Sequence, residues 1–192
     1  MHCNIQMMNI TKVVKEYVTS ECKKPSSKYG AGPLEFHFIP MVKYAKSLAK
    51  KLGADIEVVE IAAWLHDIGS IKHGRRDHHI TSAKIAEKLL KKCKYPYDKI
   101  ELVKKCILNH RGSVNNKKES LEEKIIADAD AVSNFDVIPG LFQAAYYYEK
   151  LDQGEGIESV RAKLQRKYRN LCFRESRELV KEKYKAAMLL IK

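Results

Sequence analysis

Residues 56–68 constrain the fold of this chain most, because they form its most apolar segment and have the length of a helix. Asp55 precedes the segment and Gly69 follows it. Apolar side chains occupy nearly every side of the predicted helix, and such a helix is expected to be buried on most sides. The segment therefore predicts a central helix that other helices surround.

Apolar residues recur with the 3.6-residue period of a helix in most of the remaining chain, and strand-like alternation is absent. Further helices are expected over residues 8–18, 37–52, 80–93, 97–109, 120–135, 141–151 and 157–191, the last interrupted near Cys172. Loops are expected over residues 20–33, 71–79 and 112–118. Ser120 with Glu123 fits a capping box at a helix start. We expect an all-α fold with a single core.

The domain organisation expected from this pattern is one globule in three parts. Residues 1–33 supply an N-terminal helix and loop that pack on the core, residues 34–150 form the core itself, and residues 151–192 form basic C-terminal helices of the same globule. With 192 residues, 45% of them hydrophobic, the chain can bury a sizeable core.

The composition excludes several classes of protein. No apolar run approaches the roughly 18 residues of a membrane span, and the N-terminus shows no secretory signal. The five cysteines are scattered, odd in number and lack CxxC spacing, which argues against a disulfide scaffold. We therefore expect reduced thiols, a cytoplasmic location and no membrane partner.

The positive charge is concentrated at the C-terminal end. The net charge is +12, and residues 161–192 contribute +8 of it through eleven Lys or Arg against three Glu. Such a balance favours partners that carry phosphate, including nucleotides and nucleic acid. The ordinary alternative is a solvated helix face.

His66 and Asp67 stand at the end of the most apolar segment. Burying an ionisable pair is costly unless the groups are paired or bind a metal ion. Neutral imidazole and carboxylate are both ligands of divalent metals. The alternative is a buried histidine that bonds a backbone carbonyl, with Asp67 capping a neighbouring helix.

Other candidate site residues stand at or near the ends of predicted helices. His37, His78, His79 and His110 occupy such positions and could converge in space. Asp128 and Asp130 flank the apolar stripe of residues 120–135, and the periodicity does not decide which of the two points inward.

In their order along the chain, His37, His66-Asp67 and Asp130 resemble the signature of the HD-domain metal-dependent phosphohydrolases. Two further elements match: His78 followed by Ser82-Ala83, and Ile107-Leu108-Asn109-His110. The resemblance covers roughly residues 34–150. It implies a helical bundle of the HD-domain type, with the basic C-terminal helices as an extension.

The resemblance implies that His37, His66, Asp67 and Asp130 bind a divalent ion, which could be Mn²⁺, Fe²⁺, Ni²⁺ or Mg²⁺, and that a second ion can be present. Such an ion activates a water molecule and polarises a phosphoryl oxygen. Asp67, His78 and His110 are the expected catalytic residues, and for the two histidines we favour contact with the substrate over a second metal site. Lys72, Arg75 and Arg76 are candidate phosphate clamps, with a plain basic loop as the alternative.

The function that these residues predict is metal-dependent hydrolysis of a phosphoester, a monoester or a diester, in a nucleotide or similar small metabolite. Ser70 stands where known branches of the family carry a Lys or a Glu, so no branch is assigned. One alternative is a non-catalytic, metal-centred module that binds nucleic acid through its C-terminal helices. A homodimer through those helices is also considered, with Tyr146-Tyr147-Tyr148 expected in the core or, less favoured, in the interface.

Overall fold

A computed structural model describes residues 9–111 and 117–192, and every regular element in these ranges is helical. The α-helices are α1 (Ile10–Lys23), α2 (Ile39–Leu52), α3 (Ile56–Leu65), α4 (Ile68–His73), α5 (His78–Lys92), α6 (Tyr97–Asn109), α7 (Leu121–Ser133), α8 (Ile138–Gln143), α9 (Gln153–Arg169) and α10 (Arg174–Leu190). Two π-helical turns, η1 (Leu34–Phe38) and η2 (Ala144–Tyr148), precede α2 and follow α8. The predicted all-α fold is confirmed. In the ranges described, no helix is long and apolar enough to cross a membrane.

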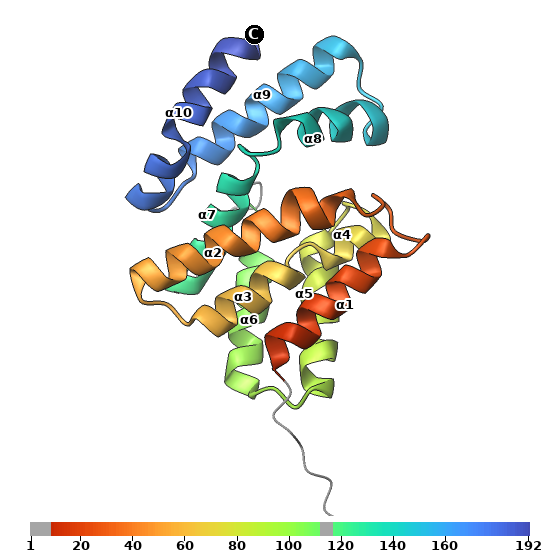
Figure 1. The fold of residues 1–192 in the computed structure, drawn as a ribbon, viewed down its shortest axis with the longest axis vertical. Helices are drawn as coiled ribbons and strands as arrows, with labels where there is room; N and C mark the ends of the chain where they lie inside the picture. Colours follow the sequence, from red (N-terminus) through yellow and green to blue (C-terminus); the bar gives the residue numbers. More distant parts are fainter. Residues whose placement is uncertain (1–8, 112–116) are drawn as a thin grey trace, which may run out of the picture.

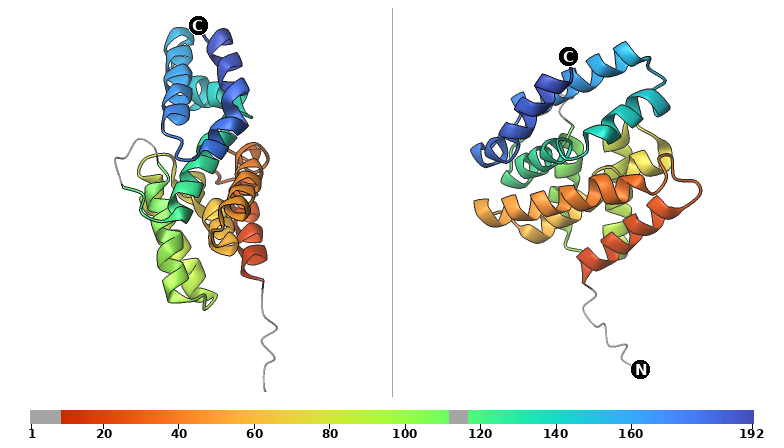
Figure 2. Two further views of the ribbon diagram at one scale, coloured as in Figure 1. Left: turned by 90° about the vertical axis from the view of Figure 1, so that its left-hand side faces the viewer. Right: turned by 45° about the horizontal axis from the view of Figure 1, so that its top comes forward.

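The helices form two groups that α7 connects (Figure 1). We call α1–α6 with η1 the N-terminal lobe and α8–α10 with η2 the C-terminal lobe. Each lobe has its own cluster of buried apolar side chains, and α7 contributes Ile125, Ile126 and Ala129 to the first and Ala131 and Val132 to the second. The additional views show α9 and α10 side by side, on the far side of α7 from α5 and α6 (Figure 2).

The apolar segment at residues 56–68 forms the buried centre of the N-terminal lobe, as predicted. In α3, Ile61 and Leu65 are fully buried, and Asp55 caps the helix by accepting a hydrogen bond from the Val58 amide at 3.1 Å. The helix ends earlier than predicted, however. The backbone of Asp67 leaves the helical region (φ −114°, ψ 13°), and the chain resumes as α4.

Gly69 lies inside α4 and does not end the preceding helix as predicted. A Cβ atom at this position would lie 2.7 Å from the His78 carbonyl oxygen and closer still to Thr81 Oγ1. The Gly69 amide donates to Ser82 Oγ at 2.8 Å. Glycine is therefore needed because α4 and the start of α5 approach closely, which brings Asp67 and His78 together.

Two predicted loops are partly helical. Helix α1 continues to Lys23 because its last turn is anchored by Glu21, which is buried and bonds Lys24 at 2.5 Å and Lys72 at 2.6 Å. Residues 71–79, predicted as a loop, contain the end of α4 and the first two residues of α5. In the predicted loop at 112–118, residues 112–116 lie outside the described part of the chain.

The tyrosine run does not pack in a core, contrary to the favoured prediction. Tyr146, Tyr147 and Tyr148 are 38%, 64% and 37% exposed. These residues belong to η2, a single five-residue π-helical turn in which only Ala145 is buried. The capping box at Ser120 and Glu123 is confirmed, with both reciprocal hydrogen bonds present.

Candidate metal centre

The candidate site is assembled from the ends of helices in the N-terminal lobe and from α7. His37 lies in η1, His66 and Asp67 occupy the break between α3 and α4, His78 is the first residue of α5, and His110 follows the last residue of α6. Helix ends place side chains at the surface where several helices meet. The π-helical turn at His37 is consistent with the frequent occurrence of such turns at functional sites.

Asp67 lies at the centre of four histidine rings. Its Oδ2 atom is 3.6 Å from both His37 Nε2 and His66 Nε2. Its Oδ1 atom is 3.1 Å from His78 Nε2 and 3.7 Å from His110 Nε2. The two oxygens therefore face two different pairs of imidazoles, and His37 Nε2 lies 2.9 Å from His66 Nε2.

Backbone carbonyls hold three of these rings in one orientation. His66 Nδ1 lies 2.8 Å from the Ala63 oxygen, His78 Nδ1 lies 2.8 Å from the Arg75 oxygen, and His110 Nδ1 lies 2.6 Å from the Ile107 oxygen. A carbonyl oxygen only accepts, so Nδ1 carries the proton in each ring and the lone pair is on Nε2. A hydrogen bond of this kind at the other ring nitrogen accompanies nearly every metal-binding histidine.

These residues fit a divalent metal ion. Asp67 Oδ1 is buried and accepts no hydrogen bond among the described residues, although a buried carboxylate oxygen normally has a partner. Two sets of ligand atoms lie close enough to hold an ion: His37, His66 and Asp67, and Asp67, His78 and His110. Because Asp67 belongs to both, the centre has the donors for one ion or for two. Imidazole nitrogen with carboxylate oxygen suits the transition metals Mn, Fe and Ni, and carboxylate also suits Mg²⁺.

Asp130 borders this cluster from α7. Its Oδ1 atom lies 3.9 Å from His37 Nε2, and its Oδ2 atom accepts a hydrogen bond from Lys167 of α9. Asp128, two residues earlier, is buried elsewhere and accepts hydrogen bonds from the amides of Cys172 at 2.8 Å and Phe173 at 3.0 Å. Of the two aspartates whose orientation the periodicity left open, Asp130 faces the site and Asp128 anchors the start of α10.

The cluster has the protonation state that a cation requires. Burial lowers the pKa of His66 to about 3 and lowers that of His110 as well. Burial alone would raise the pKa of Asp67, but the surrounding histidines hold it well below its usual range. At neutral pH the buried rings are neutral and the carboxylate is ionised, as metal binding demands.

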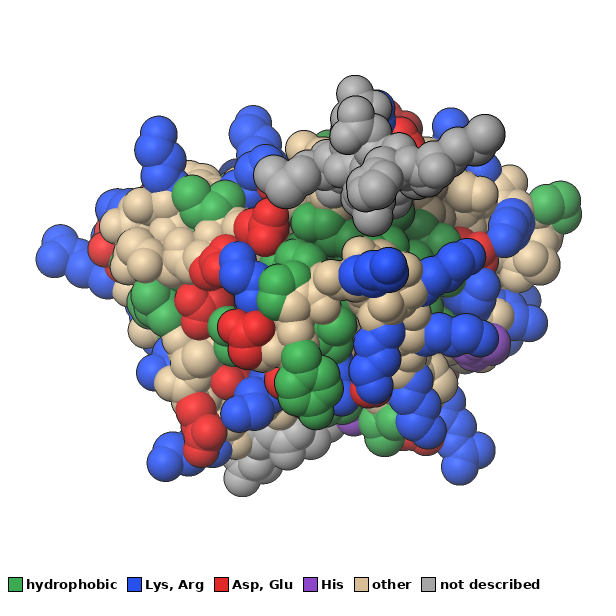
Figure 3. Space-filling view, turned by 90° about the horizontal axis from the view of Figure 1, so that it is seen from below, with side chains coloured by type: hydrophobic (Ala, Val, Ile, Leu, Met, Phe, Trp, Pro, Cys, Tyr) green, Lys and Arg blue, Asp and Glu red, His purple; other side chains and the backbone are tan. Residues whose placement is uncertain are grey.

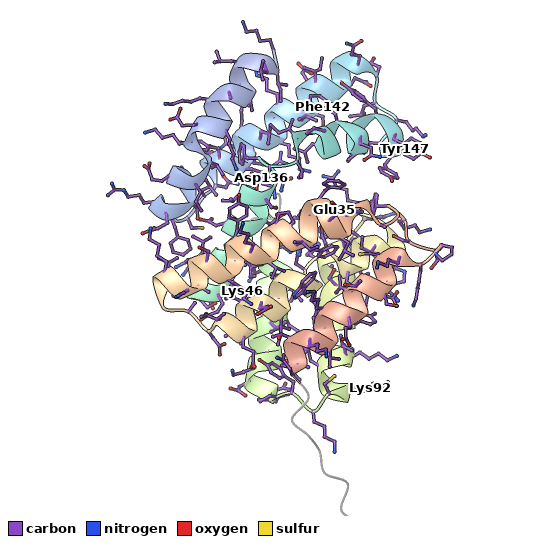
Figure 4. All side chains as sticks on the ribbon, viewed as in Figure 1. Glu35, Lys46, Lys92, Asp136, Phe142 and Tyr147 are labelled. Atoms are coloured by element: carbon purple, nitrogen blue, oxygen red, sulfur yellow. The ribbon has the colours of Figure 1, made fainter. Side chains whose placement is uncertain are left out.

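A cavity of about 830 Å³ lies above the cluster, between the two lobes. The predicted site residues His37, Asp67, His78, His110, Asp130 and Arg75 line it. Figure 4 shows the two sides of this junction. Glu35 of η1 lies at the end of the N-terminal lobe next to the C-terminal helices, and Asp136 lies where α7 meets those helices. The cavity therefore joins the candidate metal centre to the C-terminal lobe.

Two of the predicted phosphate clamps lie outside the cavity. Lys72 Nζ instead bonds Glu21 Oε2 at 2.6 Å, because α4 turns its basic face toward α1. The side chain of Arg76 is 98% exposed and lies near Asp77. Arg75 does line the cavity, where it forms an ion pair with Glu149 of the C-terminal lobe.

The C-terminal lobe contributes cations that were not predicted as site residues. Lys163, Arg166 and Lys167 of α9 line the cavity, together with Arg111 and Lys118. The spacing of three and four residues places the α9 cations on one helix face, and this was the available signal. Nothing in the sequence showed that this face turns toward Asp130.

A comparison with models of protein families shows which family this chain belongs to. The model of the HD domain matches residues 35–134, from η1 to the residue after α7. The chain belongs to the HD-domain family. The matched range contains all the residues of the candidate metal centre, and the predicted HD-type hydrolase is confirmed at the level of the family.

Individual relatives of this HD domain cover it to different extents. Ribonuclease Y of Rubrobacter xylanophilus is 33% identical over 111 residues, which are 57% of this chain and 20% of that protein. A tRNA (cytidine(56)-2′-O)-methyltransferase of Picrophilus torridus is 28% identical over 196 residues, 93% of this chain and 54% of that protein. This chain therefore spans about a fifth and about half of these two relatives.

Among solved structures, Bacillus subtilis YpgQ in complex with ADP has a similar fold. It aligns with a TM-score of 0.68 and 19% identity, over 94% of this chain and 93% of that one. The shared fold thus includes the C-terminal lobe, which lies beyond the family match.

Proposed function

We propose that this HD domain is a metal-dependent phosphohydrolase that cleaves a phosphoester of a nucleotide or a similar small phosphorylated metabolite. The observation that carries the proposal is the convergence of four imidazole Nε2 atoms on the carboxylate of Asp67, at distances of 3.1 to 3.7 Å. In three of these rings a backbone carbonyl fixes the ligand orientation.

In this proposal His37, His66, Asp67 and Asp130 hold a divalent ion, of Mn, Fe, Ni or Mg. Such an ion supplies a Lewis acid and an activated water for attack on phosphorus. Asp67 keeps its carboxylate ionised at neutral pH and joins the two pairs of histidines. His78 and His110 either contact the substrate phosphate or complete a second metal set with Asp67.

Further groups suit a phosphorylated substrate. Arg75, which lines the cavity beside His78, offers a planar guanidinium that matches phosphoryl oxygens. The cavity volume, about 830 Å³, lies within the ordinary range of small-molecule sites. The structure of YpgQ with ADP supports a nucleotide as the first class of substrate to test.

Hydrolysis of a phosphodiester in RNA by the same site is the second candidate. The similarity to ribonuclease Y and the net charge of +12 favour it. Binding to RNA through basic side chains would weaken steeply between 50 and 200 mM salt, because phosphate contacts release counterions.

The first experiment is elemental analysis of the full chain, purified without chelator or added metal, together with a screen of phosphoester substrates. We expect about one or two divalent ions per chain, and hydrolysis that requires them. His66→Ala is expected to lose both the metal and the activity while retaining its helical circular dichroism.

The matched control is His73→Ala, which removes an exposed histidine at the end of α4. It is expected to keep both the metal and the activity. Full turnover in His66→Ala under metal-replete conditions would contradict the proposal. A wild-type protein that takes up neither Mn²⁺ nor Ni²⁺ would do the same.

A further inference from the structure

Helix α9 presents a row of cations to the cavity, directly opposite the metal centre. Lys163, Arg166 and Lys167 line the cavity from one face of the helix. Lys167 is paired with Asp130. In the ranges that the structure describes, no carboxylate lies within ion-pair distance of Lys163 or Arg166.

Lys163 is held in an unfavourable electrostatic position. Burial, together with the positive charges of Lys167 and Arg75, lowers its pKa to about 7. Grouping cations in an enclosed space without counter-charges costs free energy. Such an arrangement is explained when an anionic ligand supplies the missing charge.

The carboxylates of the cavity are already committed. Its lining contains six Lys or Arg and four Asp or Glu. Asp67 and Asp130 belong to the metal centre, Glu149 pairs with Arg75, and Asp136 accepts hydrogen bonds from Lys183 and from Tyr44. The uncompensated charge facing the cavity is therefore positive.

Positive charge by itself is common on this molecule. The end of the N-terminal lobe that faces away from α9 also carries Lys and Arg side chains around its rim (Figure 3). Several lysines of that lobe are neutralised, such as Lys91 by Glu87 at 2.7 Å and Lys99 by Asp55 at 2.9 Å. Enclosure without a partner distinguishes Lys163 and Arg166 from these residues.

We propose that Lys163 and Arg166 form a subsite for a second phosphate group, so that the preferred substrate carries two or more linked phosphates. The inference rests on the proposed function, because it takes the first phosphate to lie at the metal centre. Lys167 pairs with Asp130 and therefore lies at the end of the row next to the metal centre. Lys163 lies one helical turn from Lys167, about 6 Å along the helix axis. The second phosphate would extend from the metal centre along α9.

Nucleoside polyphosphates and inorganic oligophosphates share this chemistry. Tyr29, Phe36 and Tyr148 also line the cavity, and their aromatic rings suit a base. The two kinds of ligand can be distinguished by their affinities. Tighter binding of the nucleotide than of the inorganic chain would identify a nucleoside polyphosphate as the preferred ligand.

The decisive experiment measures binding to the metal-depleted full chain by calorimetry, with orthophosphate, inorganic tripolyphosphate and adenosine triphosphate as probes. We expect the wild type to bind tripolyphosphate at least about tenfold more tightly than orthophosphate, since charged hydrogen bonds add affinity. Lys163→Met and Arg166→Met are each expected to weaken tripolyphosphate about tenfold and to leave orthophosphate nearly unchanged. Lys163→Arg, which keeps the charge, should bind like the wild type.

Lys181→Met is the matched control, because it removes one positive charge from an exposed position on α10. It is expected to bind all three probes like the wild type. An equal loss in Lys181→Met and Lys163→Met would overturn the subsite, since net charge alone would then explain the effect. Circular dichroism checks that each variant is folded, and Lys163→Gln replaces Lys163→Met if the latter is not.

Activity measurements separate this inference from the proposed function. With metal present, we expect a higher kcat/KM for adenosine triphosphate than for the monophosphate, and Lys163→Met should lower the value for the triphosphate about tenfold more than the value for the monophosphate. If the wild type hydrolyses both nucleotides with equal kcat/KM, and Lys163→Met does the same, the subsite is overturned and the proposed function stays intact. A chain that hydrolyses no probe, yet binds tripolyphosphate through Lys163, would refute the proposed function alone. Tighter binding of a short RNA than of adenosine triphosphate, lost in Lys163→Met, would overturn the inference in favour of RNA.

Discussion

The two lobes contribute different kinds of group to one cavity. The N-terminal lobe supplies the four histidines and Asp67, all at helix ends that fully buried side chains such as Ile61 and Leu65 hold in place. The C-terminal lobe supplies Lys163, Arg166 and Lys167 from the C-terminal part of a 17-residue helix. The match to the HD family stops at Asn134, so it contains the first set and excludes the second.

This difference separates the chemistry of the site from the recognition of its ligand. A metal centre needs donor atoms at fixed distances, and a well-packed core fixes them. Recognition of an anion needs charge at approximately the right place, which one face of an amphipathic helix can supply. We therefore expect substitutions in the two lobes to affect different measurements.

The largest effect is expected from Asp67→Ala. Asp67 is the only residue that belongs to both candidate sets of ligands in the described chain, so its loss should remove metal binding altogether. We expect activity to fall by more than the 10–100-fold that loss of an outer-shell partner costs. Metal content and turnover, measured on protein whose circular dichroism is unchanged, check this. Retention of one ion per chain would show that the histidines suffice.

A core substitution in the C-terminal lobe tests the other half of the comparison. Leu164 of α9 is fully buried, and Leu164→Ala is expected to cost about 2–5 kcal/mol of unfolding free energy. Metal content should stay at the wild-type value, because the two candidate ligand sets contain no residue of α9. We expect KM to rise as α9 loosens. Loss of metal in this variant would show that the lobes are not separable.

Asp128 and Asp130 lie two residues apart in α7 but serve different lobes: Asp128 bonds the start of α10, and Asp130 borders the metal centre. Asp128→Ala is expected to lower the unfolding free energy by about 1–3 kcal/mol, since it leaves the amides of Cys172 and Phe173 without their acceptor. Its metal content should not change. Asp130→Ala is expected to reduce metal affinity. Denaturant unfolding and elemental analysis of the pair distinguish the roles, and identical results would contradict them.

The smallest effect is expected from Lys72→Met, which tests a residue outside the cavity. Loss of the bond to Glu21 should cost about 1 kcal/mol and leave KM unchanged. Although burial opposes it, Lys24 and Lys72 lower the pKa of Glu21 below its ordinary value of 4.5. The stabilisation is therefore present above pH 4.5 and is lost as the pH falls through the lowered pKa. Thermal unfolding of both proteins at pH 7 and at acidic pH measures the difference.

The sequence predicted the elements of the site better than their surroundings. Helical periodicity suffices to predict a helical bundle. That His37, His66, Asp67 and Asp130 lie together was predicted only from the resemblance of their order to the HD family. The break after Leu65 could not be predicted, since apolar residues recur at helical spacing from Ile56 to Ile68. It depends on the close approach of Gly69 to the His78 carbonyl, which is a tertiary contact.

Long-range pairing explains the remaining differences. The choice between Lys72 and Arg75 as a cavity residue depends on Glu21, 51 positions before Lys72. Likewise, the role of Asp128 depends on amides 44 and 45 positions later. Neither relationship leaves a local pattern in the chain, whereas the spacing of the α9 cations did leave one.

The lobes are joined differently at the two edges of the cavity, and one of these edges contains the ion pair of Arg75 with Glu149. At one edge, α7 joins the lobes covalently and contributes to both cores. At the other edge, that exposed ion pair and the edge contact of Tyr29 with Tyr148, at 4.8 Å between ring centroids, connect the lobes. Exposed ion pairs are weak and are screened by salt. We therefore expect ligands to exchange at the Arg75 edge, at a rate that increases with ionic strength.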